Sequence, residues 1–189
     1  TNAHALARYA SLCQEINIVP IVEPEVLMDG MHTIDRCAQI TGQTLKVVFR
    51  ELNNFNVMLE GIVLKPNMVI SGLQCEEQAD IHQVSEMTVQ CLKANVPESV
   101  PGIAFLSGGQ TSDLATDHLN CMNRNYLDSI PWNLTFSYGR ALQADALEGW
   151  SGNNRDLGQE NLIKRAMCNG MATTGSYSEG IAPVAISTV

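Results

Sequence analysis

Lys65 is the side chain with the clearest potential for covalent chemistry in this chain of 189 residues. It follows an apolar run at 57–64 and directly precedes Pro66. Because proline cannot donate to a sheet ladder and restricts the residue before it, we expect a buried parallel strand to end at this lysine. Two interpretations stay open. Lys65 is either a solvated lysine at the rim of a strand or a partly desolvated amine that attacks a carbonyl and forms a Schiff base.

Two carboxylates, Glu23 and Glu25, follow an earlier apolar run at 18–22. Residues two apart in an extended segment point to the same side, so these side chains would face the same space. A carboxylate pair can act as acid and base beside a reacting group. The alternative is a solvated rim, or a partner for a nearby lysine, and the spacing alone does not decide between them.

Small residues and an arginine follow the last two apolar runs, 102–106 and 133–136. Glycine lets the backbone approach an anion closely, a helix start favours negative charge, and arginine can hold a phosphate through two hydrogen bonds. Most Gly-Gly turns are merely turns, but two such segments at neighbouring strand ends predict a phosphate site. Its candidate residues are Ser107, Gly108, Gly109, Ser137, Gly139 and Arg140.

Metal and cofactor motifs are missing from the sequence. The four histidines have no metal-ligand spacing, and neither a P-loop nor a GxGxxG motif occurs. We therefore expect no metal site and no cofactor. The six cysteines are scattered without a CxxC pair, which is typical of reduced thiols in a cytosolic-type compartment.

The formal net charge of -9 argues against nucleic acid or an anionic membrane as the main partner. A hydrophobic fraction of 45% with 16% charged residues suits a soluble globular protein. We find no signal peptide and no apolar run of membrane-spanning length. Because the first residue is Thr1 and not Met, we expect the chain to start inside a longer reading frame.

Apolar runs alternate with stretches of helical periodicity, which predicts an α/β fold with parallel strands. The strand ends collect the polar residues named above, as in a (β/α)-barrel. A barrel closes with about eight strands, so four would leave two open sheet edges. The predicted strands are 18–22, 57–64, 102–106 and 133–136; the predicted helices are 2–17, 34–53 with Thr33 as N-cap, 81–94, 112–124, 140–150 and 157–172, followed by a mobile segment from 173.

Four segments, IVPIVEPE, LEGIVLKPNM, VPGIAFLSGG and FSYGRALQ, resemble in this order the class I fructose-1,6-bisphosphate aldolases. LARYASLCQ and KRAMCNG resemble the same family. The resemblance implies a (β/α)8 TIM barrel, of which this chain supplies about the last four βα units. It also implies that 1–177 form the C-terminal half of a single domain and that 178–189 form a flexible tail.

The resemblance assigns roles to several residues. Lys65 would form the Schiff base, Glu23 would act as the acid/base that helps to dehydrate the carbinolamine, and Glu25 would support it. Ser107, Gly108, Gly139 and Arg140 would bind a substrate phosphate. The implied reaction is the reversible cleavage of fructose 1,6-bisphosphate to dihydroxyacetone phosphate and glyceraldehyde 3-phosphate, a lyase step of glycolysis and gluconeogenesis without metal or cofactor.

The resemblance further implies a cytoplasmic homotetramer, a missing N-terminal barrel half as partner, and cytoskeletal or proton-pump partners. Two other functions stay open: a related lysine-dependent sugar-phosphate aldolase, and a non-catalytic half-barrel that binds phosphorylated ligands or a partner chain. The chain departs from the family at its end. The family ends in a tyrosine implicated in proton transfer, whereas this chain ends in Val189, and Tyr177 matches a more internal position.

Overall fold

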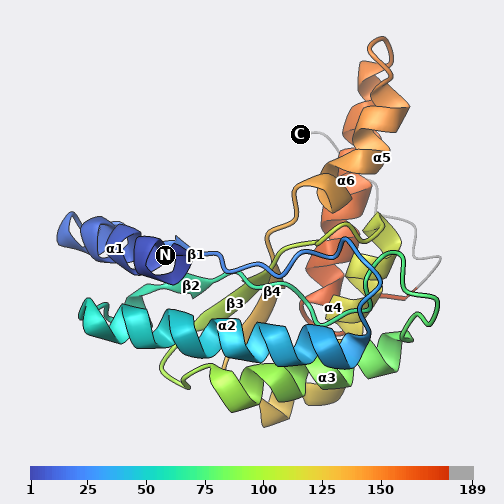
Figure 1. The fold of residues 1–189 in the computed structure, drawn as a ribbon. Helices are drawn as coiled ribbons and strands as arrows, with labels where there is room; N and C mark the ends of the chain where they lie inside the picture. Colours follow the sequence, from blue (N-terminus) through green and yellow to red (C-terminus); the bar gives the residue numbers. More distant parts are fainter. Residues whose placement is uncertain (179–189) are drawn as a thin grey trace.

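One sheet of four parallel strands organises the molecule (Figure 1). The computed structural model describes residues 1–178, and in it the strands lie in sequence order. Leu64 pairs with Val22 on one side and with Ile103 on the other. Parallel strands in sequence order require a crossover after each strand, as the alternating pattern predicted. The strands are β1 (Ile21–Val22), β2 (Val63–Leu64), β3 (Gly102–Phe105) and β4 (Asn133–Phe136).

A row of helices packs side by side, with α1 on α2, α2 on α3, α3 on α4 and α4 on α6 (Figure 1). Helix α5 packs on α6, and this pair projects from the body of the molecule. Among the described residues, no helix is long and apolar enough to cross a membrane. The helices are α1 (Asn2–Glu15), α2 (Ile34–Asn54), α3 (Ile81–Asn95), α4 (Ser112–Tyr126), α5 (Arg140–Trp150) and α6 (Arg155–Ala172), with short 3-10 helices at Leu59–Gly61 and Leu127–Ser129.

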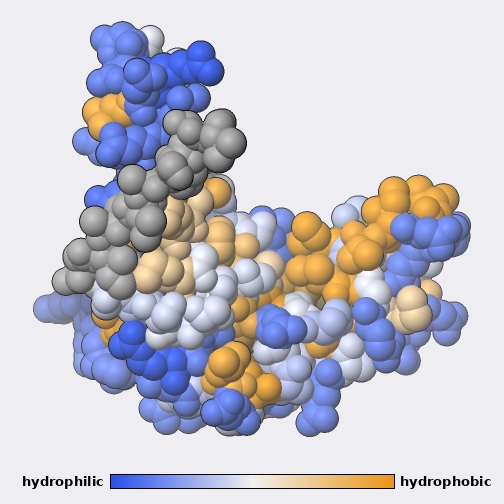
Figure 2. Space-filling view, turned by 180° about the vertical axis from the view of Figure 1, so that it is seen from behind, coloured by the Kyte–Doolittle hydropathy of each residue, from blue (hydrophilic) through white to orange (hydrophobic). Residues whose placement is uncertain are grey.

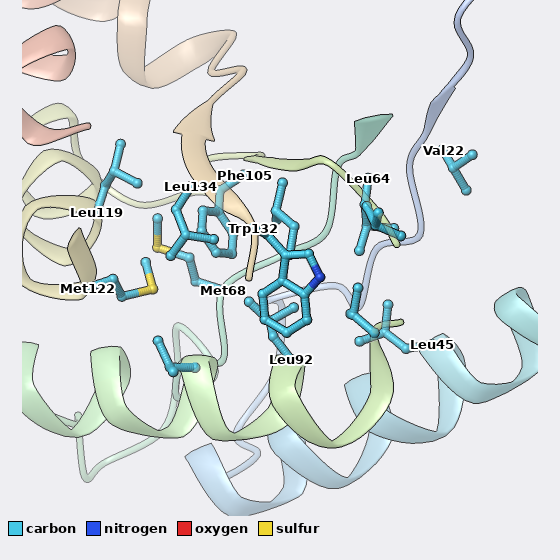
Figure 3. Close-up of a cluster of buried hydrophobic side chains, with 14 of the residues drawn as sticks. Val22, Leu45, Leu64, Met68, Leu92, Phe105, Leu119, Met122, Trp132 and Leu134 are labelled. Atoms are coloured by element: carbon cyan, nitrogen blue, oxygen red, sulfur yellow. The ribbon is translucent and has the colours of Figure 1, made fainter. Parts of the chain in front are cut away.

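The core lies between the sheet and the helices (Figure 3). Leu64 and Ile103 are fully buried there, and Leu45 of α2 and Leu92 of α3 pack into the same cluster. Each such side chain stabilises the fold by roughly 1.5–3 kcal/mol. Because successive residues of a strand point to opposite faces, the residue after Leu64 faces away from the helices. The core therefore determines the direction in which Lys65 points.

Side-chain caps mark where several helices begin. Thr33 accepts a hydrogen bond from the N–H of Arg36 (3.3 Å), which confirms its predicted role at the start of α2. Asp80 caps α3, and Thr111 caps α4. Such caps satisfy N–H groups that lack a partner within the helix. They fix the beginning of each helix directly after the loop at a strand end.

Two predicted strands, 18–22 and 57–64, are longer than the strands that form. Ile18 and Val19 precede β1 and are 52% and 61% exposed. Residues Leu59–Gly61 form a 3-10 turn in place of extended chain. Asn17 and Asn56, directly before the two predicted strands, have φ angles of 59° and 53°, a left-handed conformation that turns the chain before each apolar run. An apolar run does not by itself distinguish a strand from a partly exposed turn.

The predicted mobile segment begins too early at 173. Asn120 donates through Nδ2 to the carbonyl of Tyr177 (3.0 Å) and accepts from its N–H (3.0 Å). Arg124 also donates to the Tyr177 carbonyl (2.9 Å). These bonds attach 173–177 to α4. The predicted flexible tail lies outside the described residues from 179 onward.

Candidate active site

Lys65 and Glu23 lie opposite each other at the ends of neighbouring strands. The N–H of Lys65 donates to the carbonyl of Val22 (2.8 Å), which extends the β1–β2 pairing beyond Leu64. Nζ of Lys65 is 3.1 Å from Oε1 of Glu23. The lysine side chain is 19% exposed and the glutamate side chain 45% exposed. This geometry gives a partly shielded amine a carboxylate within proton-transfer distance.

Lys65 projects from the sheet face opposite the helices. Leu64 is buried under the helix layer, so the next residue, Lys65, points the other way, and Glu23 reaches its amine from the end of β1. Figure 2 shows the molecule from behind, with apolar surface lining the depression between α1 and the projecting α5–α6 pair. Glu25 is exposed while Pro24 is buried, as expected for two carboxylates that point to the same side.

A hollow of about 830 Å³ lies beside the two carboxylates. Glu23 and Glu25 line one side, and residues of α1 and α2, among them Leu6 and Val47, line the rest. Lys65 is not part of its lining. The hollow is therefore next to the carboxylates but is not the space between the lysine and the glycine loops.

The loop after β3 requires glycine at two positions. Gly108 and Gly109 have φ angles of +54° and +77°, which side chains rarely allow. A Cβ atom on Gly108 would also approach Cε of Met28 to 3.1 Å. Ser107 is buried just before this turn. The positive φ angles, more than a lack of space, favour glycine at both positions, and Gly109 leaves its backbone exposed at this turn.

Gln110 and His118 support this loop from behind. Gln110 donates to the Ser107 carbonyl through its backbone N–H (3.1 Å) and through Nε2 (2.9 Å). Its Oε1 lies 2.5 Å from Nδ1 of His118, so the ring must donate from Nδ1. Burial lowers the pKa of His118 to about 4, which keeps the ring neutral. The sequence interpretation considered His118 only as a metal ligand and missed this role.

The segment after β4 combines an uncapped helix start with an arginine. The N–H of Ser137 donates to the carbonyl of Phe105 (2.8 Å), which continues the β3–β4 pairing. Gly139 is the N-cap of α5 and supplies no side-chain cap, and a Cβ atom there would meet nothing within 4 Å. Arg140 is exposed at the first position of the helix. This end of α5 can accept an anion.

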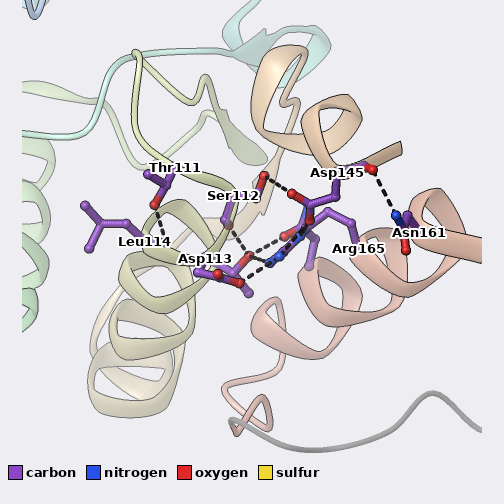
Figure 4. A network of polar contacts seen from close by, with 9 residues as sticks. Thr111, Ser112, Asp113, Leu114, Asp145, Asn161 and Arg165 are labelled. Atoms are coloured by element: carbon purple, nitrogen blue, oxygen red, sulfur yellow. Dashed lines mark hydrogen bonds and ion pairs between the residues drawn. The ribbon is translucent and has the colours of Figure 1, made fainter. Parts of the chain in front are cut away.

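Arg165 joins the helices that follow the two loops (Figure 4). Its guanidinium donates to Asp113 of α4 (2.7 Å) and to Asp145 of α5 (2.9 and 3.0 Å). Burial alone would lower the pKa of Arg165, but its hydrogen bonds and ion pairs with Asp113 and Asp145 raise it. Nothing in the sequence pattern pointed to this network, because its members come from three separate helices.

The predicted site residues all follow the carboxyl ends of the four strands. Lys65 and Glu23 contact each other directly. The phosphate candidates at 107–109 and 137–140 follow the next two strands of the same sheet. Within residues 1–178, no group of three or more His, Cys, Asp or Glu side chains is arranged to hold a metal ion.

A family model described as fructose-bisphosphate aldolase class-I (Glycolytic) matches residues 1–188. The chain belongs to this family. It is 53% identical over 179 residues to a probable fructose-bisphosphate aldolase class 1 of Xanthomonas campestris, covering 93% of this chain and 53% of that protein. It is 51% identical over 178 residues to fructose-bisphosphate aldolase B of Gallus gallus, covering 93% of this chain and 49% of that protein. The predicted family is thus confirmed.

The solved structure of the Plasmodium falciparum fructose-bisphosphate aldolase has the same fold, with a TM-score of 0.90 and 47% sequence identity. The match covers 95% of this chain and 52% of that chain, which was solved in complex with TRAP and a small-molecule inhibitor. The predicted α/β fold, part of a (β/α)8 barrel, is confirmed. This aldolase chain spans about half the length of the curated relatives it matches.

Proposed function

We propose that this chain contributes the Schiff-base site of a class I fructose-bisphosphate aldolase, which cleaves fructose 1,6-bisphosphate reversibly to dihydroxyacetone phosphate and glyceraldehyde 3-phosphate. The main support is the 3.1 Å contact between Nζ of Lys65 and Oε1 of Glu23 at adjacent strand ends. A nucleophilic amine beside a carboxylate is the pair that imine formation requires. Glu25 points to the same side and would support Glu23.

In the proposed reaction, Nζ of Lys65 attacks the C2 ketone and forms a carbinolamine. Glu23 gives a proton to the C2 hydroxyl, which leaves as water, and an iminium remains. A base takes the proton of the C4 hydroxyl, the C3–C4 bond breaks, and its electron pair moves into the iminium to give an enamine. The aldehyde product then leaves. Protonation at C3 and hydrolysis release dihydroxyacetone phosphate and restore the amine.

The loops after β3 and β4 would hold a substrate phosphate. At the turn Gly109 is exposed and Gly108 beside it is buried, and the open N-terminus of α5 at Gly139 faces the same end of the sheet. Arg140 would supply charge and paired hydrogen bonds. Ser107 and Ser137 complete the proposed phosphate site.

Assembly and partners belong to the same proposal. We infer a cytoplasmic homotetramer in which further βα units complete the barrel around Lys65. We also propose a protein partner of the cytoskeletal type. That a relative can bind another protein is supported by the Plasmodium falciparum aldolase, which was solved in complex with TRAP. The net charge of -9 favours neither nucleic acid nor an anionic membrane as partner.

Borohydride trapping tests the proposed function. The protein is incubated with fructose 1,6-bisphosphate and borohydride in the presence of EDTA, and modified peptides are mapped by mass spectrometry. We expect one stable adduct, on Lys65, which disappears in Lys65→Arg because a guanidinium keeps the charge but does not form the imine. The matched control Lys46→Arg, on the exposed face of α2, leaves the adduct unchanged.

The other outcomes separate the alternatives. An adduct on Lys65 with a different sugar phosphate only would indicate a related lysine-dependent aldolase. A third outcome is that the protein binds the bisphosphate but forms no adduct, also in a longer form with the remaining barrel strands. This result would favour a non-catalytic binding protein. An adduct on a lysine other than Lys65 would contradict the assignment.

A further inference from the structure

The main-chain pairing between β1 and β2 stops at the candidate site. Its last bond runs from the N–H of Lys65 to the carbonyl of Val22 (2.8 Å), and Pro66 has no N–H with which to continue. The next bond between the two segments comes from a side chain: the N–H of Val26 donates to Oδ1 of Asn67 (3.0 Å). The carboxylate segment 23–25 lies between these two bonds.

The orientation of the Asn67 carboxamide is fixed by its other contacts. Nδ2 donates to Oγ1 of Thr41 on α2 (3.0 Å) and to the carbonyl of Met68 (3.0 Å). Because both N–H groups are used, Oδ1 is the atom that faces Val26. Asn67 is 2% exposed and Thr41 is 3% exposed. One buried amide therefore connects α2 to the segments that follow both strands.

The ion pair itself is poorly suited to fix the geometry. The Glu23 side chain is 45% exposed, and a pair that water reaches contributes little net stability and allows several arrangements. The bonds of Asn67 are shielded from water, and breaking one leaves a buried polar group without a partner. The amide, not the ion pair, thus has the rigidity that positioning requires.

We propose that Asn67 is a positioning residue that holds Glu23 and Glu25 within reach of the Lys65 amine. Asn67 does not touch the reacting atoms; it acts through Val26 and the carboxylate segment. The kinetic part of this inference rests on the proposed Schiff-base function. A displacement of about 1 Å at a reacting pair can cost about 100-fold in rate.

Three substitutions test the proposal in the full chain. Asn67→Leu has a similar volume and loses the hydrogen bonds to Val26, Thr41 and Met68. Asn67→Asp keeps an acceptor for Val26, and its second oxygen can accept from the Thr41 hydroxyl. The matched control is Asn123→Leu: Asn123 is 1% exposed and bonds the carbonyls of Leu119, Leu134 and Ala172, on the far side of the sheet from β1.

Trapping kinetics and amide exchange give separate readouts. In Asn67→Leu we expect the trapping rate at saturating fructose 1,6-bisphosphate to fall about 10- to 100-fold, with a change of less than about threefold in the half-saturating concentration. Hydrogen exchange at the Val26 amide accelerates about tenfold or more, since its acceptor is gone. Asn67→Asp recovers part of both effects, and Asn123→Leu leaves both within about twofold of the starting protein.

The proposal is overturned if Asn67→Leu leaves trapping and Val26 exchange unchanged, or if Asn123→Leu lowers the trapping rate equally. If Asn67→Leu does not fold, Thr41→Val, which removes the acceptor for Nδ2, takes its place. Both effects then keep their direction but are smaller, because Oδ1 of Asn67 still accepts from Val26. If the unsubstituted protein forms no adduct, also in a longer form with the remaining barrel strands, the proposed function fails. Two readouts that need no adduct then test the role of Asn67: amide exchange at Val26 and the rate at which acetic anhydride acylates Lys65. If Asn67 positions the carboxylates, both rates are higher in Asn67→Leu than in the starting protein. If it does not, neither rate changes.

Discussion

Burial determines the protonation state of His118, which supports the loop after β3. His118 is 2% exposed, and Nδ1 donates to Gln110, while Nε2 has no hydrogen-bond partner within residues 1–178. A second proton on Nε2 would place an unpaired charge inside the core. The neutral ring is therefore part of the support for Ser107, and that support depends on pH.

The pH dependence of stability has a definite sign. The ordinary pKa of 6.5 for histidine applies to the unfolded chain, and burial lowers the pKa of folded His118 to about 4. Between these values the unfolded state binds more protons, so stability is full above pH 6.5 and falls as the pH decreases toward 4. The loss contributed by this residue approaches about 3 kcal/mol at the acid end.

His118→Asn tests this dependence, because the asparagine amide can still donate to Gln110 but does not titrate. We expect the free energy of unfolding of the variant to decrease less between pH 7 and pH 5 than that of the starting protein, measured with urea. The control His82→Asn alters an exposed histidine and keeps the original slope. Equal slopes for His118→Asn and the starting protein would contradict the assignment.

Residue types and strand positions were sufficient to predict part of the candidate site. Lys65 before Pro66 and Glu23 two residues from Glu25 could be selected because each follows an apolar run. The supporting residues could not be selected in this way. Asn67 bonds Val26 and His118 bonds Gln110 through side chains, and hydrogen-bond partners of this kind depend on tertiary packing and not on a local pattern.

At the scale of elements, the helices were predicted well and the strands less well. Helix α2 has a capping threonine and a regular apolar stripe, so its beginning and inward residues follow from sequence. Strand β2 has two residues within a longer apolar run, and the turn at Leu59–Gly61 was hidden in that run. Glu60 is exposed and Leu59 and Gly61 are only half-buried, so the apolar composition of the run does not show where the extended chain begins.

The Arg165 network fixes how α4, α5 and α6 lie relative to one another. It thereby influences the distance between the loops after β3 and β4, which we propose to bind phosphate. Arg165 is 10% exposed, whereas Asp113 and Asp145 are 73% and 39% exposed. Loss of the guanidinium removes charged hydrogen bonds but leaves the two carboxylates largely in water. The cost is therefore moderate and is concentrated at the junction of these helices.

For Arg165→Gln we expect a loss of about 1–3 kcal/mol in the free energy of unfolding, measured with urea. The double variant with Asp145→Asn should lose less free energy of unfolding than the sum of the losses in the two single variants, since both changes remove the same interaction. Arg155→Gln, at the exposed start of α6, is the matched control and changes stability by less than about 0.5 kcal/mol. An equal loss for Arg155→Gln, or strict additivity, would argue against the network.

At the scale of the whole molecule, the sheet presents two edges. Within the described residues, β1 pairs only with β2 and β4 only with β3. The approach to β1 is apolar and exposed: Ile16 is 66% and Val19 is 61% exposed. Figure 2 shows apolar surface continuing from this end of the molecule into the depression. An unpaired strand edge beside apolar surface favours association with another chain.

We therefore expect the 189 residues, when produced alone, to self-associate, with sedimentation velocity as the measurement. Replacing Ile16 and Val19 together by Glu should shift the distribution toward monomer, because charge beside an open edge opposes edge-to-edge pairing and removes apolar contact area. Leu73→Glu, on an exposed loop after β2, adds charge elsewhere and should leave the distribution nearly unchanged. A monodisperse and fully active monomer of the unsubstituted chain would contradict this expectation, since the open edges would then need no partner for either folding or chemistry.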